Sequence, residues 1–366
     1  MSIRWYRRVA YFRLGVYSRT MPVMSRKPKS PYAWLDLSDE QLLDVRICDL
    51  KIRIEDTPLV DRLEELYAEL ERRGIQFRPY AWLSTDWFTP DGVTGFAVPF
   101  YLAHPRLLRL ERRLMLEAEG SSRDECMKIM RHEAAHAIDN AYRLRRRKAW
   151  RETFGHASLP YESTYAPDPT SREHVLNLDY WYSQSHPLED FAETFAVWLR
   201  PGSRWRARYE GWPALDKLEY VDQTMRRIGD QSPKLRTRFQ IERLSSLRLT
   251  LRTHYERKRR YYMTEGNPAL DGQLARVFPS TGDGKKRPRA STFLKRSRRE
   301  LVRRVSQTTG QHRYLLDHVV REMIDRCQTK DLRLAAGPVD SLVTASILLT
   351  SLSSQFLYGA HPKFHR

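Results

Sequence analysis

The chain has 366 residues, more than one hydrophobic core usually organises, so a large domain with a smaller appendage is expected. Hydrophobic residues make up 41% of the sequence, which is enough to form a sizeable core. Lys and Arg outnumber Asp and Glu by 64 to 45, giving a formal charge of +19. This excess predicts either non-specific attraction to nucleic acid and anionic surfaces or simply a solvated basic exterior.

The cysteines and the N-terminal residues bear on the location of the protein. Cys48, Cys126 and Cys327 are odd in number and far apart, which excludes a disulfide framework and a paired-thiolate metal site. The first 35 residues carry eight Lys or Arg and no acid, and they lack the apolar core of a secretory signal. Residues 1–35 are therefore interpreted as a basic arm, which is disordered, a weak surface anchor, or sequence upstream of a start at Met24. We expect a cytoplasmic protein.

Two helices and then two strands are predicted after this arm. Ser38 and Gln41 have the spacing of a capping box and begin the first helix, which continues to about Ile52. Leucines at helical spacing in residues 59–70 predict a second helix, and Gly74 ends it. The apolar runs that predict two strands of one sheet are residues 75–83 and 96–102.

The next predicted helix carries two histidines four residues apart. Ser122 and Glu125 form another capping box, and an apolar stripe with a period of three to four residues follows from Met127. His132-Glu133-Ala134-Ala135-His136 lies on this helix, on a face beside the stripe. Residues 152–186 are rich in Tyr, Pro, Ser and His, so they are predicted to be irregular.

The rest of the chain is predicted to be helical, with one interruption. A further helix begins at Pro187, which fits a first helical turn, and more helices follow to about residue 265. The uncharged segment 341–358 contains five serines, which favours a buried helix over a membrane span. The predicted division is a basic arm at 1–35, a main domain at 36–265, a basic linker at 266–305 and a C-terminal helical region at 306–366.

The two histidines and the glutamate between them have the spacing of a catalytic metal site. Residues four apart on a helix share a face, so the imidazoles of His132 and His136 can converge on one Zn²⁺ ion. Glu133 points to one side and is expected to act as general base toward a metal-bound water. The alternative is that both histidines have a purely structural role.

A catalytic zinc site needs a third protein ligand, and two acids on the helix after Pro187 are the best candidates. Glu189 and Glu193 are four residues apart on one face. This spacing suits one carboxylate on the metal and the other on the second N–H of a ligand imidazole, although two solvated surface acids have the same pattern. The weaker candidates for the third ligand are His156, His174 and His186.

The sequence His-Glu-Ala-Ala-His-Ala-Ile-Asp-Asn, with the later Glu-Asp-Phe-Ala-Glu-Thr-Phe, resembles a bacterial family of zinc-binding metallopeptidases. It is also similar to the catalytic core of anthrax lethal factor, within the gluzincin group. The resemblance is specific over about residues 120–200. It implies that Glu189 is the third ligand and that Glu193 supports the ligands without binding the metal itself. It also implies a catalytic role for Tyr182, seven residues before Glu189, whose phenol would stabilise an oxyanion.

The predicted elements give an α+β fold, mainly helical with a small sheet, plus the C-terminal helical region. The resemblance implies that the main domain is zincin-like (gluzincin). The expected function is a zinc metallopeptidase with a peptide or protein substrate, and the same residues would also suit hydrolysis of a non-peptide amide or an amino-acid conjugate. The third alternative is a basic nucleic-acid-binding or scaffold protein with a structural zinc site. Arg145 and its basic neighbours follow the metal helix and are interpreted either as a group that steers an acidic substrate or as a solvated face. Asp139 is either a support of His136 or a surface or capping acid.

Overall fold

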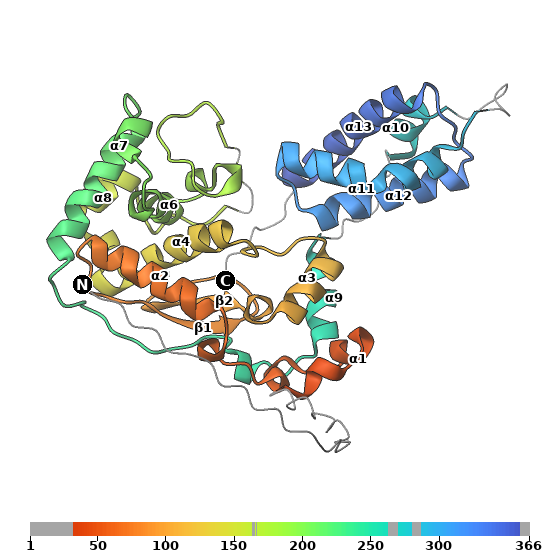
Figure 1. Cartoon of the computed structure of the whole chain (residues 1–366). Coiled ribbons are helices and arrows are strands. Elements are labelled where there is room, and N and C mark those ends of the chain that lie inside the picture. Colours follow the sequence, from red (N-terminus) through yellow and green to blue (C-terminus); the bar gives the residue numbers. More distant parts are fainter. Residues whose placement is uncertain (1–31, 163–164, 166, 263–269, 280–286, 359–366) are drawn as a thin grey trace, which may run out of the picture.

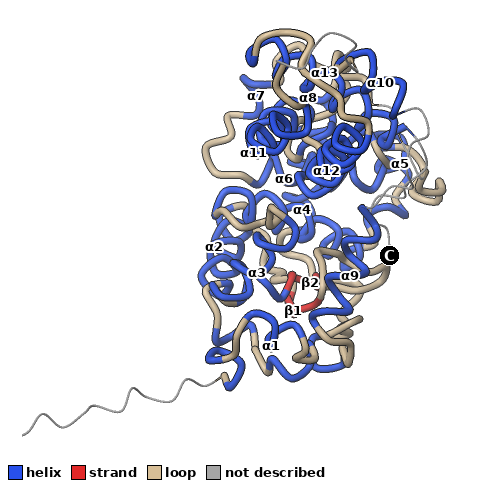
Figure 2. The backbone as a smooth tube through the Cα atoms, turned by 90° about the vertical axis from the view of Figure 1, so that its right-hand side faces the viewer, coloured by secondary structure: helices blue, strands red, loops and turns tan. Residues whose placement is uncertain are grey.

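The computed structural model describes residues 32–162, 165, 167–262, 270–279 and 287–358, so residues 1–31 of the predicted basic arm lie outside it. The described chain is mainly helical with one small parallel sheet, which confirms the α+β class (Figures 1 and 2). The helices are α1 (Asp39–Leu43), α2 (Leu59–Arg72), α3 (Pro105–Met115), α4 (Arg123–Tyr142), α5 (Lys148–Phe154), α6 (Pro187–Leu199), α7 (Trp205–Arg208), α8 (Ala214–Ile228), α9 (Leu251–Tyr262), α10 (Leu270–Val277), α11 (Ala290–Thr309), α12 (Arg313–Thr329) and α13 (Pro338–Tyr358).

The sheet consists of β1 (Tyr80–Ser84) and β2 (Gly95–Pro99), which run parallel with Tyr80 opposite Gly95. Gly95 allows this close pairing, because a Cβ atom there would lie 2.3 Å from the carbonyl oxygen of Tyr80. Phe88 forms a single antiparallel bridge with Ala97 of β2, and the backbone N–H of Ala97 donates to the Phe88 carbonyl at 2.8 Å. The segment before Pro90 therefore lies beside the edge of β2 that β1 does not occupy.

The first helix is shorter than the sequence predicts. The capping box of Ser38 and Gln41 is present, but α1 ends at Leu43. The backbone N–H groups of Ile47 and Cys48 donate instead to the carbonyls of Leu249 and Leu247, at 3.0 and 2.9 Å. A segment about 200 residues later in the chain thus takes the hydrogen bonds that would have extended the helix, which local spacing could not reveal.

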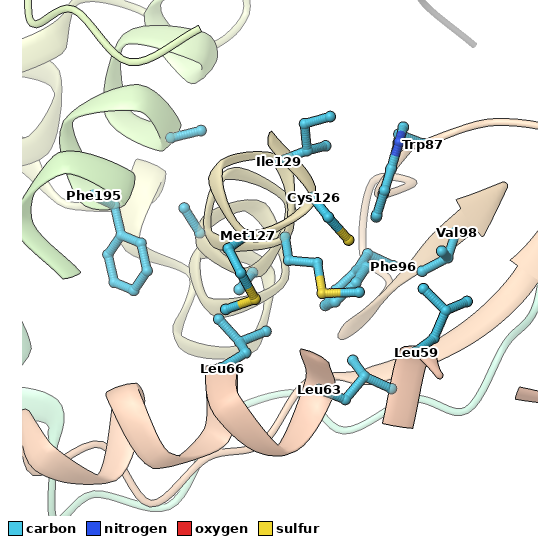
Figure 3. Close-up of a cluster of buried hydrophobic side chains, with 14 of the residues drawn as sticks. Leu59, Leu63, Leu66, Trp87, Phe96, Val98, Cys126, Met127, Ile129 and Phe195 are labelled. Atoms are coloured by element: carbon cyan, nitrogen blue, oxygen red, sulfur yellow. The ribbon is translucent and has the colours of Figure 1, made fainter. Parts of the chain in front are cut away.

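Helix α4 lies at the centre of the larger part of the molecule. It packs against α2, α6 and β2 (Figure 1). Figure 3 shows Met127 next to Leu66 of α2, Cys126 directed toward Phe96 of β2, and Phe195 of α6 on another side. Nearly every α4 residue from Cys126 to Tyr142 is buried, so the helix has no solvated face along most of its length.

Helices α10 to α13 have a hydrophobic core of their own, separate from the core around α4 (Figure 1). The stretch 266–305, which the sequence suggests is a basic linker, contains α10 and most of α11, and Leu274 and Leu294 are fully buried there. The domain boundaries themselves stay a prediction. One contact between the two parts is an ion pair of 2.9 Å between His312 Nε2 and Glu117 Oε1.

Helix α13, predicted to be buried, has two unlike sides. Leu349 and Leu352 pack in the core of the C-terminal helices, whereas Val339, Val343 and Ile347 are exposed. Among the described residues, no helix is both long and apolar enough to cross a membrane.

The ion pair between Arg131 of α4 and Glu69 of α2 generates the first prediction. The guanidinium makes two bonds of 2.7 Å to the carboxylate, and the two side chains are only 8% and 1% exposed. Removing one partner leaves a buried charge unpaired, so Glu69→Ala should lower the free energy of unfolding by about 3–5 kcal/mol. Urea-induced unfolding measures this loss.

A matched control exists one helical turn earlier. Glu65 of α2 pairs with Arg123 of α4, but the Arg123 side chain is 56% exposed. Glu65→Ala should therefore cost less than about 1 kcal/mol. Equal losses in the two variants would contradict the view that burial makes the Arg131–Glu69 pair a main anchor of α4.

Candidate metal centre

Three donor atoms from two helices converge in the interior. His132 and His136 lie on α4 and Glu189 lies on α6. Glu189 Oε2 is 3.0 Å from His132 Nε2 and 3.3 Å from His136 Nε2, and the two imidazole nitrogens are 3.1 Å apart. Within the described part of the chain, this is the group of histidines, cysteines and acids that could hold a metal ion.

The spacing of these atoms fits a small tetrahedral cation. With zinc–ligand bonds of about 2.0–2.1 Å, two ligands at the corners of a tetrahedron are roughly 3.3–3.4 Å apart. The observed separations of 3.0, 3.1 and 3.3 Å are close to that edge. Two nitrogens and one carboxylate oxygen are also a ligand set that zinc accepts.

Glu193, one turn after Glu189, fixes the orientation of the His132 ring. Its Oε1 lies 2.8 Å from His132 Nδ1 and also accepts a bond of 2.8 Å from Asn177 Nδ2. Its Oε2 accepts the backbone N–H of Leu178 at 2.7 Å. Because a carboxylate only accepts, Nδ1 of His132 carries a proton, and Nε2 is the nitrogen that faces the centre of the site, where its lone pair is available to a metal ion whenever the ring is neutral.

The charges around the site favour a bound positive charge. Burial alone would lower the pKa of His132, but its hydrogen bonds to Glu189 and Glu193 raise that pKa well above the usual range. Burial favours protonation of Glu189, yet the two imidazoles hold the pKa of this carboxyl well below its usual range. Lone pairs that face one another at these distances repel unless a proton or a cation lies between them, so the group can bind either.

The carboxylate of Glu133 lies beside this group and has one evident partner. The hydroxyl of Thr89 donates to Glu133 Oε2 at 2.7 Å. Burial raises the pKa of Glu133, while the neighbouring His132 and His136 act in the opposite direction. Thr89 follows Phe88, the residue bridged to β2, so this bridge fixes the position of the Thr89 hydroxyl.

The segment between α5 and α6 adds two tyrosines. Tyr182, in a 3-10 helix at Asp179–Gln184, has its ring centroid 5.7 Å from that of His132. Burial and then the negative charge of Glu189 raise the pKa of Tyr182 well above its usual value, so its phenol stays protonated. Tyr161 donates to Glu189 Oε1 at 2.8 Å.

The weaker candidate ligands lie elsewhere. His186 is the N-cap of α6, where its Nδ1 accepts the backbone N–H of Leu188. His174 Nε2 is 3.8 Å from Asp190, and His156 is exposed. None of the three belongs to the converging group.

Two polar residues near α4 have structural partners. Asp139 is fully buried and accepts the backbone N–H of Arg145 at 2.7 Å. The Arg145 guanidinium also pairs with the buried Asp139 and the exposed Asp91, so Arg145 itself has acidic partners and is not part of a solvated face.

The sequence did not point to four of the residues that complete the site: Thr89, Tyr161, Asn177 and Leu178. Residues 155–186 have no helical or strand periodicity, so no pattern indicates that Asn177 and Leu178 contact Glu193. Tyr161 belongs to an aromatic-rich stretch, which was the one available signal. Comparison of the chain with protein-family models, curated proteins and solved structures gives no match.

The bonds of Glu193 generate the second prediction. Glu193→Gln keeps the side-chain shape but replaces one accepting oxygen with an NH₂ group, which faces a donor in every orientation. We expect its affinity for Zn²⁺ to fall about 10- to 100-fold, as is usual when the partner of a ligand histidine is lost. Competition with a chromophoric chelator measures the affinity. Glu173→Gln, at an exposed position, serves as the control, and equal affinities in both variants would contradict the role of Glu193.

Proposed function

We propose that this protein is a zinc-dependent hydrolase of the gluzincin type, with a zincin-like fold, and that its substrate is a peptide or protein. The observation that carries the proposal is the convergence of His132, His136 and Glu189 with the Glu133 carboxylate beside them. Zinc bound there would lower the pKa of a bound water to roughly 7 and polarise the scissile carbonyl.

The protein's own groups have defined tasks in this reaction. Glu133 would accept the proton of the attacking water, and the Thr89 hydroxyl at 2.7 Å would hold its carboxylate in place. Burial raises the pKa of Glu133, which makes the carboxylate a stronger base than one in water. The protonated phenol of Tyr182 would donate to the oxygen of the carbonyl as negative charge develops.

The position of the base favours a peptide over a small amide as substrate. Thr89 directly follows the residue bridged to β2, so backbone at the edge of the sheet lies next to the Glu133 carboxylate. Extended peptides bind such edges through main-chain hydrogen bonds. Hydrolysis of a non-peptide amide would use the same catalytic residues, and a screen of both substrate classes separates the two.

Metal content tests the proposal directly. Purified wild-type protein should contain one zinc per chain by elemental analysis after loosely bound metal has been removed. Glu189→Gln should contain much less, because an amide oxygen is a far weaker ligand than a carboxylate. A wild-type protein that takes up no zinc after reconstitution would refute the proposed function.

A second substitution separates metal binding from catalysis. Glu133→Gln should keep its zinc, since Glu133 lies outside the converging group, but it should lose hydrolysis by at least about 100-fold through removal of the base. The measurement is cleavage of a peptide library followed by mass spectrometry. Undiminished turnover in the zinc-loaded variant would exclude Glu133 as the base.

The phenol of Tyr182 has its own kinetic signature. Tyr182→Phe should lower kcat by about 100-fold or more and leave KM nearly unchanged, because an oxyanion donor acts mainly in the transition state. Steady-state kinetics on the best library peptide measure both constants. A rise in KM at constant kcat would show instead that Tyr182 only binds the substrate.

A further inference from the structure

The two oxygens of Glu189 have different surroundings. Oε2 faces both imidazoles, at 3.0 Å from His132 Nε2 and 3.3 Å from His136 Nε2. Oε1 accepts a hydrogen bond of 2.8 Å from the phenol of Tyr161. Glu189 is only 4% exposed, so the phenol of Tyr161 is a specific partner within a site that largely excludes water.

Tyr161 is held in place by the helix that carries Glu189. Its ring stacks on the imidazole of His186, with centroids 3.8 Å apart and planes at 20°. His186 is itself fixed on both ring nitrogens, because Nδ1 accepts the backbone N–H of Leu188 at 3.2 Å and Nε2 lies 2.9 Å from the carbonyl of Leu159. Since Nδ1 accepts, Nε2 is the protonated nitrogen and donates to Leu159. The N-cap of α6 thus also anchors the segment that bears Tyr161.

We propose that Tyr161 is a positioning residue for Glu189: by occupying Oε1 it makes the carboxylate bind zinc through Oε2 alone. This inference rests on the proposed zinc site. A carboxylate can contribute one oxygen or two, and a second oxygen would take the position that a catalytic zinc keeps for water or substrate. The hydrogen bond of Tyr161 draws Oε1 away from the metal and keeps that position open.

The conservative substitution Tyr161→Phe isolates the hydroxyl, because the ring that stacks on His186 is retained. The probes are the affinity for Zn²⁺, measured by chelator competition, and the visible spectrum of the protein reconstituted with Co²⁺. We expect the affinity to fall about 10- to 100-fold. The cobalt bands should weaken, since binding through both oxygens raises the coordination number and five-coordinate cobalt absorbs less than four-coordinate cobalt.

Tyr67→Phe provides a matched control. It also loses one hydroxyl hydrogen bond, of 2.7 Å to the carbonyl of Pro79, but on α2 and outside the converging group. Its zinc affinity and cobalt spectrum should equal those of the wild type. A general effect of losing a tyrosine hydroxyl would appear in both variants, whereas a positioning effect appears in Tyr161→Phe alone.

The outcomes separate this inference from the proposed function. Zinc binding by the wild type with an unchanged affinity and spectrum in Tyr161→Phe would overturn the role of Tyr161 and leave the hydrolase proposal standing. A wild type without zinc affinity would refute the hydrolase proposal itself. Higher peptidase activity in Tyr161→Phe would also overturn the inference, because it would mean that the phenol obstructs the site.

Discussion

The burial of α4 on nearly every side is the constraint on which the site depends. A helix in that position must pair each polar side chain inside the protein, because water does not reach them. Arg131 pairs with Glu69, His132 with Glu193, and Glu133 with Thr89. Each of these partners comes from a different element, so the same bonds that satisfy the polar groups of α4 also fix the neighbouring segments around it. Stability and the geometry of the candidate metal centre therefore have a common origin.

The parts of the site that depend on local geometry could be predicted from the sequence. Two histidines four residues apart share a helix face wherever the helix lies, and Pro187 correctly indicates the first turn of α6. The spacing also identified Glu189 and Glu193 as a pair, but it left their roles open because both lie on one face of the helix. The distances resolve that ambiguity: Glu189 Oε2 faces the imidazole Nε2 atoms, and Glu193 contacts Nδ1 of His132.

The parts that depend on distant contacts could not be predicted. The apolar period of α4 indicated one buried stripe with the histidines beside it, whereas the structure buries nearly the whole circumference of the helix from Cys126 to Tyr142. The first helix stops early because residues 247–249 bond to its continuation. Asn177 and Leu178 occupy an irregular segment and donate hydrogen bonds to the carboxylate of Glu193, a residue on the following helix. In each case the deciding interaction joins segments that no sequence period connects.

The two carboxylates of α6 connect the candidate metal centre to the irregular segment before it. Glu193 accepts from Asn177 and Leu178 at one end of that segment, and Glu189 accepts from Tyr161 at the other. The hydrogen bonds of this segment and the converging donor group thus share the same two carboxylates. Because Tyr161 of this segment contacts the proposed ligand Glu189, a cation bound there and the position of the segment should be thermodynamically linked. Because the proposed ligands lie on the buried helices α4 and α6, changes elsewhere in this segment would alter the surroundings of the candidate site without moving the ligands.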